Sequence, residues 1–224
     1  MKLLLVGFGR MGRLVEDLAR DAGHTIAGRI VSGTPAGDWP AADVAVDFST
    51  AGAVRDNGLR LAARGTHLVI GTTGWQTHEA ELREAAERAG IGVVASANFS
   101  IGVNIFQMLA AEAARLMQAQ PDYGAWIHEL HHAAKKDAPS GTALMLKAAL
   151  GGAGYTRAID LSSTRAGSIP GTHTIGFDGP SDTIELTHTA RDRRGFARGA
   201  LVAAEWVKDR RGWFTMSDVL RGSS

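Results

Sequence analysis

The chain contains no cysteine, and this absence removes several kinds of chemistry at once. Disulfide bonds, cysteine-ligated zinc, iron-sulfur clusters and thiol nucleophiles are all excluded. An excess of charge of one sign is absent too, because 24 lysines and arginines against 23 aspartates and glutamates give a formal charge of +1. The overall charge therefore offers no reason to expect nucleic acid or an anionic membrane as a partner.

Long hydrophobic runs are also lacking. No stretch approaches the ~18 consecutive apolar residues of a membrane span. The apolar start at Leu3–Val6 is interrupted by Gly7, Gly9 and Arg10. It falls well short of the roughly 7 to 15 apolar residues that a signal peptide needs. We therefore expect a cytoplasmic protein with no membrane partner.

Glycine, by contrast, is abundant. The 224 residues include 28 glycines, about 12% against a usual ~7%. This many glycines indicate tight loops that approach a ligand closely. The length suits one large or two small domains, and the 45% of hydrophobic and 21% of charged residues are typical of globular proteins.

The first hundred residues alternate short apolar runs with helical patterns. The runs are β-branched or leucine-rich and lack polar alternation, as strands buried on both faces do. They cover residues 3–6, 25–31, 44–48, 68–70 and 91–95. Three helical patterns lie between them, at residues 11–22, 51–64 and 77–89. This order predicts an α/β fold with a Rossmann-like, doubly wound parallel sheet.

After about residue 99 the pattern changes. A helix over 104–118 precedes a strand, a charged loop and a short helix, and three strand-like runs follow, at 158–165, 172–177 and 183–189. A last amphipathic helix over 196–208 could return to cover the first sheet. We expect two domains, residues 1–99 with 197–224 and residues 100–196, the second of α+β character on a mixed sheet.

The sequence Gly7-Phe8-Gly9-Arg10-Met11-Gly12 has the pattern GxGxxG between the first predicted strand and the first predicted helix. Such glycines permit a tight turn and close approach of the backbone to a pyrophosphate, whose charge the amides at the helix start can hold. In this context the pattern predicts dinucleotide binding by the first domain. The alternative is a glycine turn with a purely structural role.

The type of nucleotide stays open between NADPH and NADH. An acidic residue about 20 residues after the glycines would hold the ribose 2′-hydroxyl of NADH, but residues 29–34 read Arg-Ile-Val-Ser-Gly-Thr. The missing acid, with Arg29 and Ser32 nearby, favours NADPH or the use of both. Arg29 could equally be a solvent-facing strand residue.

Two further loops follow predicted strands at the edge where open α/β sheets bind ligands. They are Gly71-Thr72-Thr73-Gly74 and Ser96-Ala97-Asn98-Phe99. Their small residues would permit backbone contacts to a nicotinamide and its ribose, although ordinary turns would look similar. Asp47-Phe48-Ser49-Thr50 is a less specific loop of the same kind.

The segment 128–143 is the most informative for chemistry. His131 and Lys135 lie close in sequence to a predicted helix start, for which Asp137 or Ser140 is a candidate cap. The free amides of Gly141 and Thr142 would form an anion site that suits a carboxylate. A solvated loop with incidental histidines is the alternative.

The same segment contains His128-Glu129-Leu130-His131-His132, which satisfies the zinc pattern HExxH. That pattern binds zinc only on a helix, which places both histidines on one face. The preceding residues 123–127 are typical of a strand, and Pro139 and Gly141 follow soon after. We therefore expect no metal site.

Taken together, these segments resemble the dihydrodipicolinate reductase family, and the likeness covers nearly the whole chain. The motifs that carry it are GFGRMG (7–12), DFST (47–50), GTTG (71–74), SANFSIGVN (96–104), ELHHAAKKDAPSGTA (129–143), RAGSIPGTH (165–173), ELTHTA (185–190) and FARGA (196–200). The most specific is ELHHAAKKDAPSGTA, since GxGxxG occurs in many unrelated enzymes. The chain departs from the family in its short segment between the second and third strands, and in Val31, where similar short members carry an acid.

The resemblance implies a reductase of 4-hydroxy-tetrahydrodipicolinate in lysine and diaminopimelate biosynthesis. His131 would be the proton donor and Lys135 its assistant, while His132, Gly141 and Thr142 would bind a dicarboxylate substrate. Coenzyme contacts would fall on Gly7, Phe8, Gly9, Arg10, Met11, Gly12, Gly71, Thr72, Thr73, Ser96, Ala97, Asn98 and Phe99. Arg165 and His173 are further candidates for anion or proton contacts, unless they pair within a strand. The resemblance also implies a homotetramer, formed through the sheet of the second domain, whose exposed strands need covering.

Two other functions remain as alternatives. One is an NAD(P)-dependent reductase of another imine or carbonyl compound. The other is a module that binds NAD(P) and signals its redox state without catalysis, which gives no reason for His131 and Lys135 to flank an anion-binding helix start.

Overall fold

A computed structural model describes residues 1–222. Within it the chain forms two compact units. The first unit contains Met1–Ile101 and the chain from Arg193 on, and the second contains Gly102–Asp192. The second unit is thus an insertion between two parts of the first.

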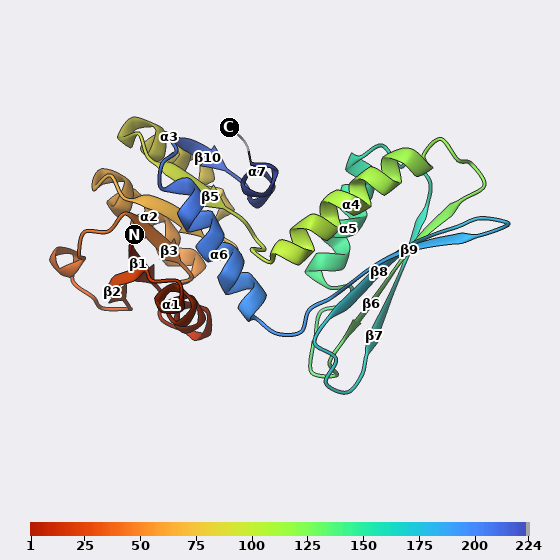
Figure 1. Cartoon of the computed structure of the whole chain (residues 1–224), viewed down its shortest axis with the longest axis horizontal. Coiled ribbons are helices and arrows are strands. Elements are labelled where there is room, and N and C mark those ends of the chain that lie inside the picture. Colours follow the sequence, from red (N-terminus) through yellow and green to blue (C-terminus); the bar gives the residue numbers. More distant parts are fainter. Residues whose placement is uncertain (223–224) are drawn as a thin grey trace. The chain divides into compact units, whose positions relative to one another are not determined.

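Six strands form the sheet of the first unit, and all neighbours run parallel (Figure 1). The strands are β1 (Lys2–Val6), β2 (Thr25–Ile30), β3 (Val44–Asp47), β4 (His67–Ile70), β5 (Gly92–Ala95) and β10 (Gly212–Phe214). Their order across the sheet is β10-β5-β4-β3-β1-β2. The winding direction therefore reverses between β1 and β3, which is where open α/β sheets bind ligands.

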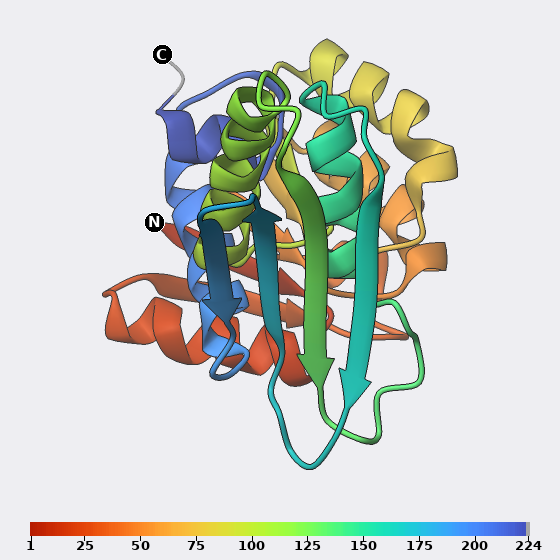
Figure 2. The same cartoon turned by 90° about the vertical axis from the view of Figure 1, so that its right-hand side faces the viewer.

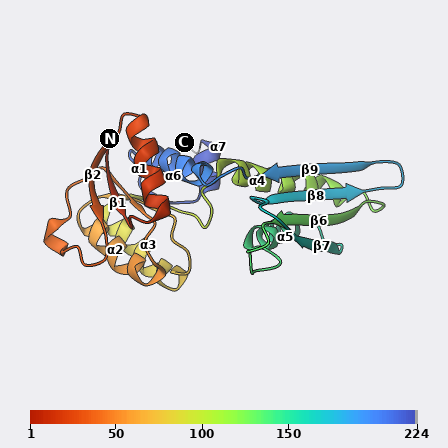
Figure 3. The same cartoon turned by 90° about the horizontal axis from the view of Figure 1, so that it is seen from below.

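Helices cover both faces of this sheet (Figure 3). On one face, α1 (Arg10–Asp21), α6 (Arg194–Val207) and α7 (Met216–Arg221) pack against side chains such as Leu3 and Val46. On the other face, α2 (Ala51–Ala63) and α3 (Glu79–Ala89) pack against Leu4 and Ala45. Alternate residues of each strand enter the two cores, which explains why the strands read as unbroken apolar runs. Two short 3-10 helices, Ala36–Asp38 and Gln76–His78, lie in the connections.

The C-terminal part contains two elements that the sequence did not predict. After α6, the three-residue strand β10 pairs with β5 at one edge of the sheet, and α7 follows. A capping box opens α7, since the Thr215 hydroxyl accepts from the Asp218 amide and the Asp218 carboxylate accepts from the Thr215 amide.

The second unit is a four-stranded mixed sheet with two helices on one face (Figure 2). The elements are α4 (Ile101–Met117), β6 (Gly124–His131), α5 (Gly141–Gly152), β7 (Ile159–Arg165), β8 (Thr172–Asp178) and β9 (Thr183–Thr189). The strand order is β7-β6-β8-β9, with β6 and β7 parallel and the other two pairs antiparallel. Side chains such as Phe106, Leu146 and Ile175 form the core between sheet and helices. The predicted fold class is confirmed.

Strand β6 is longer than the sequence indicated and includes residues predicted to belong to a charged loop. Ala125, Ile127 and Glu129 alternate along it on the buried face. A charged residue at a core position concealed the end of this strand in the sequence. Among residues 1–222, no helix has both the length and the apolar character needed to cross a membrane.

Candidate active site

The glycine-rich turn joins β1 to α1 in the first unit. Gly7 has φ +86°, and a Cβ there would lie 2.4 Å from the Phe48 carbonyl oxygen, so the turn requires glycine. At Gly9, the N-cap of α1, a Cβ would meet nothing within 4 Å. Within the described chain no side chain caps α1, and its first turn carries no acidic residue. The amides at the start of α1 thus face open space that can accept an anion.

A cavity of about 360 Å³ lies beside this turn. It is lined by Gly9–Met11, Phe48–Ala51 and Gly71–Thr73, so three of the loops singled out in the sequence meet there. Their convergence follows from topology, because β1, β3 and β4 are neighbours and end at one edge. The fourth loop, Ser96–Phe99, does not line this cavity. Phe99 is buried, and its ring packs edge-on against Phe48 at 6.3 Å between centroids.

A buried carboxylate holds two of these loops in place. Asp47, at the end of β3, accepts hydrogen bonds from the Ser49 amide at 2.9 Å and the Ser49 hydroxyl at 2.6 Å. The Thr72 hydroxyl and the side-chain amide of Asn57 also donate to it, each at 3.0 Å. Asp47 therefore fixes the loop after β3 to the loop after β4.

Near the end of β2, Arg29 is held by a buried acid. Its Nε donates to Glu16 on α1 at 2.9 Å, and its guanidinium lies over the Phe8 ring at 4.9 Å from the centroid. The hydrogen bond from Arg29 is the main reason why the pKa of Glu16 lies below its usual value. Val31, directly after β2, is 52% exposed. Arg29 is therefore anchored on one side, with almost half of its side chain exposed.

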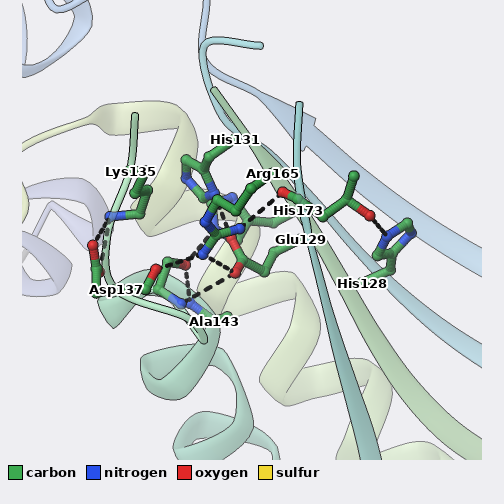
Figure 4. A network of polar contacts seen from close by, with 10 residues as sticks. His128, Glu129, His131, Lys135, Asp137, Ala143, Arg165 and His173 are labelled. Carbon is green, nitrogen blue, oxygen red and sulfur yellow. Dashed lines mark hydrogen bonds and ion pairs between the residues drawn. The ribbon is translucent and has the colours of Figure 1, made fainter. Parts of the chain in front are cut away.

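In the second unit, Glu129 and His131 lie on the same face of β6, two residues apart (Figure 4). The Glu129 side chain is fully buried, and its Oε2 contacts Nδ1 of His131, which makes an ion pair when the imidazole is protonated. The Arg165 guanidinium, from the end of β7, donates to Oε1 of Glu129 at 2.6 Å, and the Ser140 amide donates to the same oxygen at 3.2 Å. The Glu129 carboxylate thus joins β6, β7 and the start of α5.

His173, on β8, completes this buried cluster. Its ring meets that of His131 edge-on at 5.1 Å between centroids, and its Nε2 lies 3.1 Å from the Ser140 hydroxyl. Burial, with the nearby His131 as a smaller cause, lowers the pKa of His173 to about 4. His173 is therefore neutral near pH 7.

Opposing effects set the ionisation of the other two groups. Burial alone would raise the pKa of Glu129, but hydrogen bonds from Arg165 and Ser163 and the proximity of His131 lower it to about 2. Burial lowers the pKa of His131, Glu129 counteracts this, and Lys135 and Arg165 lower it further. Glu129 is the nearby group that favours the charged imidazole.

The loop after β6 carries the remaining candidates. Lys135 Nζ contacts both carboxylate oxygens of Asp137, at 2.7 and 2.8 Å, and Arg165 donates to the Asp137 carbonyl at 2.6 Å (Figure 4). His132 is exposed. Arg165 thus fastens the loop to β7 while it binds Glu129.

Helix α5 begins directly after this loop. Its N-cap is Ser140, whose hydroxyl accepts from the Ala143 amide at 3.2 Å. A Cβ at Gly141 would meet nothing within 4 Å, so the space beside the first turn is open. Asp137, the other candidate cap, instead pairs with Lys135.

The HExxH pattern does not form the helix that zinc binding by it requires. His128–His131 belong to strand β6, and His128 contacts the Thr164 hydroxyl at 3.0 Å, away from Glu129 (Figure 4). A different trio, Glu129, His131 and His173, offers ligand-type atoms within 4.8 Å of one another. The positive charges of Arg165 and Lys135 beside it disfavour a divalent cation, so we interpret the trio as a proton-handling cluster.

Comparison with known proteins identifies the family of the chain. Two family models match the chain: "Dihydrodipicolinate reductase, N-terminus" over residues 37–99 and "Dihydrodipicolinate reductase, C-terminus" over residues 102–220. The chain belongs to the dihydrodipicolinate reductase family.

Individual members of this family are similar over most of their length. A 4-hydroxy-tetrahydrodipicolinate reductase of Christiangramia forsetii is 38% identical over 234 aligned residues, 98% of either chain. One from Methanosarcina barkeri is 41% identical over 195 residues, 80% of this chain and 73% of its own. The structure of a dipicolinate-bound dihydrodipicolinate reductase from Paenisporosarcina sp. TG-14 shares the fold, with a TM-score of 0.82, 20% identity and coverage of 96% of this chain and 97% of that one.

The sequence predicts His131, Lys135 and the start of α5 as site features, but it does not predict the role of Glu129, which contacts three other parts of the site. Glu129 drew attention only as the acid of HExxH, while Arg165 and His173 stayed ambiguous. One signal could have found Glu129: it continues the alternation of Ala125 and Ile127, which places a carboxylate on the core face. No local signal indicated that Arg165 and His173 would meet it, because both contacts depend on strand register.

Proposed function

We propose that this chain is a 4-hydroxy-tetrahydrodipicolinate reductase of lysine and diaminopimelate biosynthesis. It would use NAD(P)H to reduce the dehydrated form of its substrate to tetrahydrodipicolinate, with a proton from His131. One observation carries the proposal: an imidazole in close contact with a buried carboxylate that also anchors the start of α5. An acid and an anion-binding helix start are what the reduction of a cyclic dicarboxylate requires.

The substrate's carboxylates would bind to the second unit. The amides of Gly141 and Thr142 at the open start of α5, together with the Thr142 hydroxyl, would hold one carboxylate. Exposed His132 and half-buried Lys135 would contact the substrate from the loop. Because Lys135 pairs with Asp137, it would have to exchange this partner for a substrate carboxylate. That exchange replaces one charge-assisted contact with another and needs no unpaired ammonium.

His131 would act as the general acid. Its pKa is lowered by burial, so the free enzyme holds a largely neutral ring near pH 7. Two substrate carboxylates nearby would raise that pKa again and favour the charged, proton-donating form. Lys135 would assist through its positive charge.

The first unit would bind the coenzyme, and the glycine turn fits a pyrophosphate. The open space at Gly9 and the uncapped start of α1 support this assignment for Gly7–Gly12. Gly71–Thr73 and Ser96–Phe99 would contact the nicotinamide end. When bound, NAD(P)H supplies the hydride. An acid after β2 would repel a 2′-phosphate, and Val31 stands there instead, so NADPH as well as NADH should be used.

The second unit would also form the oligomer. In that unit α4 and α5 cover one face of the sheet, and Figure 2 shows the other face without helices. By analogy with the family, we propose a homotetramer built through that face. A molar mass near four chains in light scattering would support it.

Steady-state kinetics would test the proposed reaction. The substrate is generated enzymatically, and oxidation of NADPH and NADH is followed in parallel. We expect substrate-dependent turnover with both coenzymes. Turnover only with other imines or carbonyls would favour the broader reductase function, and tight coenzyme binding without any turnover would favour the sensing module.

A further inference from the structure

Glu129 is an unusual residue, a carboxylate whose side chain has no exposure at all. Acidic side chains are almost never buried in this way unless they are paired, because an unpaired buried charge costs several kcal/mol. Here one oxygen accepts hydrogen bonds and the other is in close contact with an imidazole nitrogen. Oε1 accepts hydrogen bonds from Arg165 and from the Ser140 amide, and Oε2 faces Nδ1 of His131.

The two edges of the His131 ring have different surroundings. The Nδ1 edge faces Glu129 in the interior. The edge that contains Cδ2 and Nε2 lies beside Gly171, where a Cβ would come within 3.2 Å of both atoms. Gly171 also has φ +129°, which favours glycine. A residue with no side chain thus keeps the second edge of the ring clear.

We infer that Glu129 is a positioning residue for the reaction: its carboxylate holds the Nδ1–H form of His131 and thereby leaves Nε2 as the atom that exchanges protons with the substrate. The inference rests on the proposed role of His131 as the acid. Glu129 also accepts a hydrogen bond from the amide of Ser140, the N-cap of α5. One carboxylate therefore orients both the proton donor and the proposed carboxylate-binding helix start.

The charges around His131 determine the sign of the expected effect. Glu129 faces the ring from β6, Arg165 from β7, His173 from β8 and Lys135 from the loop. His173 is neutral near pH 7, and Lys135 and Arg165 both oppose a charged imidazole. Glu129 is the group among these that favours it, so loss of its charge must make His131 harder to protonate.

The test uses the full-length protein with ¹⁵N-labelled histidine, observed by NMR. The His131 signals are assigned by their absence in His131→Gln. In the unchanged protein we expect the neutral ring to carry its proton on Nδ1. A proton on Nε2 would overturn the inference. The tautomer is read in the unchanged protein, and His131→Gln serves only to assign the signals.

The variant Glu129→Gln keeps the shape of the side chain and an acceptor for the Ser140 amide but removes the charge. We expect the His131 titration midpoint to fall by about one pH unit or more. The acidic shift should recur in the pH profile of kcat, and kcat near pH 7 should fall by about tenfold with a smaller change in KM. The matched control is Glu112→Gln, which removes a carboxylate paired with Arg115 on the surface of α4 and should leave both readouts unchanged.

The outcomes separate this inference from the proposed function. A folded Glu129→Gln protein with an unchanged His131 midpoint would show that Glu129 is only structural, and would overturn the inference. If the tautomer and midpoint behave as expected but His131→Gln turns over normally, the positioning holds and the proposed acid is wrong.

Discussion

The two candidate binding regions differ in the chemical groups that form them. The cavity of the first unit is formed by backbone and small side chains at Gly9, Ser49, Gly71 and Thr72. The cluster of the second unit is formed by ionisable side chains, Glu129, His131, Arg165 and His173, held by one another. The first region can bind a ligand through backbone amides, which every residue except proline has, whereas the second depends on the identity of each side chain.

This difference predicts which kind of substitution impairs each region. A site made of backbone is damaged by added atoms, because there is no room for them. A site made of buried charges is damaged by removal of a charge or a proton, because the partner is left unpaired. Substitutions of both kinds can therefore test the comparison.

The largest effect is expected in the second unit. The substitution His131→Gln removes the proposed general acid while it keeps a polar side chain of similar length. We expect kcat to fall by roughly 10² to 10⁴, with a smaller change in KM, as loss of a general acid does. Steady-state kinetics at saturating NADPH measure this. Lys136→Gln, an exposed charge in the same loop, is the control and should retain its kcat. An unchanged kcat in His131→Gln would remove the residue from the mechanism.

The next effect concerns the backbone site. Gly7→Ala places a methyl group 2.4 Å from the Phe48 carbonyl at a positive φ. Strain of roughly 1–2 kcal/mol from the left-handed backbone adds to a clash of about 1–3 kcal/mol. We expect nucleotide affinity to fall by at least about tenfold in a fluorescence titration with NADPH. Gly37→Ala, where a Cβ meets nothing within 4 Å, should bind normally. Equal affinity in both variants would show that the turn tolerates a side chain.

The same difference explains what the sequence could predict. The glycine turn was recognisable because its requirement is local: strand, glycines and helix follow one another along the chain. In the second unit, the local motif located His131, Lys135 and the start of α5, but not the partners of Glu129. These partners lie on β7 and β8, and the register between β6 and these strands decides which of their residues face Glu129.

Two smaller misses have a similar cause. Strand β10 is three residues long, which is too short to show any periodicity. It forms because it can pair with the edge of β5. The charge of Glu129 predicts a loop at the end of β6, whereas in the structure the strand continues to His131. The burial of Glu129 depends on Arg165, which is 36 residues further along the chain. Pairing across the fold, and not local propensity, decides both cases.

The third prediction concerns pH and the second unit. Folding lowers the pKa of His173 from 6.5 to about 4, so the unfolded chain binds this proton first. The contribution of His173 to stability is therefore fully present above pH 6.5. It is lost as the pH falls from 6.5 toward 4, and the free energy of unfolding decreases by on the order of 3 kcal/mol at most. The pKa values of His131 and His188 are lowered too and act in the same direction.

Urea denaturation at several pH values measures this loss. Trp126 is the single tryptophan of residues 102–192, so the ¹⁹F signal of its fluorinated form reports on the second unit. His173→Gln should flatten the dependence between pH 6.5 and 4, whereas His132→Gln, an exposed position, should leave it unchanged. The same pH dependence in His173→Gln as in the unchanged protein would contradict the assignment.

The smallest effect concerns a side-chain charge introduced after β2, at Val31. Val31 follows β2 and is 52% exposed, so an acid fits there without loss of packing. In Val31→Asp the carboxylate could accept from a ribose 2′-hydroxyl and would repel a 2′-phosphate. We expect the ratio of kcat/KM for NADH to that for NADPH to rise by about tenfold, or ~1.4 kcal/mol. Val31→Asn has nearly the same shape without the charge. If it changed the ratio as much as Val31→Asp, the shape and polarity of the side chain, and not its charge, would govern coenzyme choice.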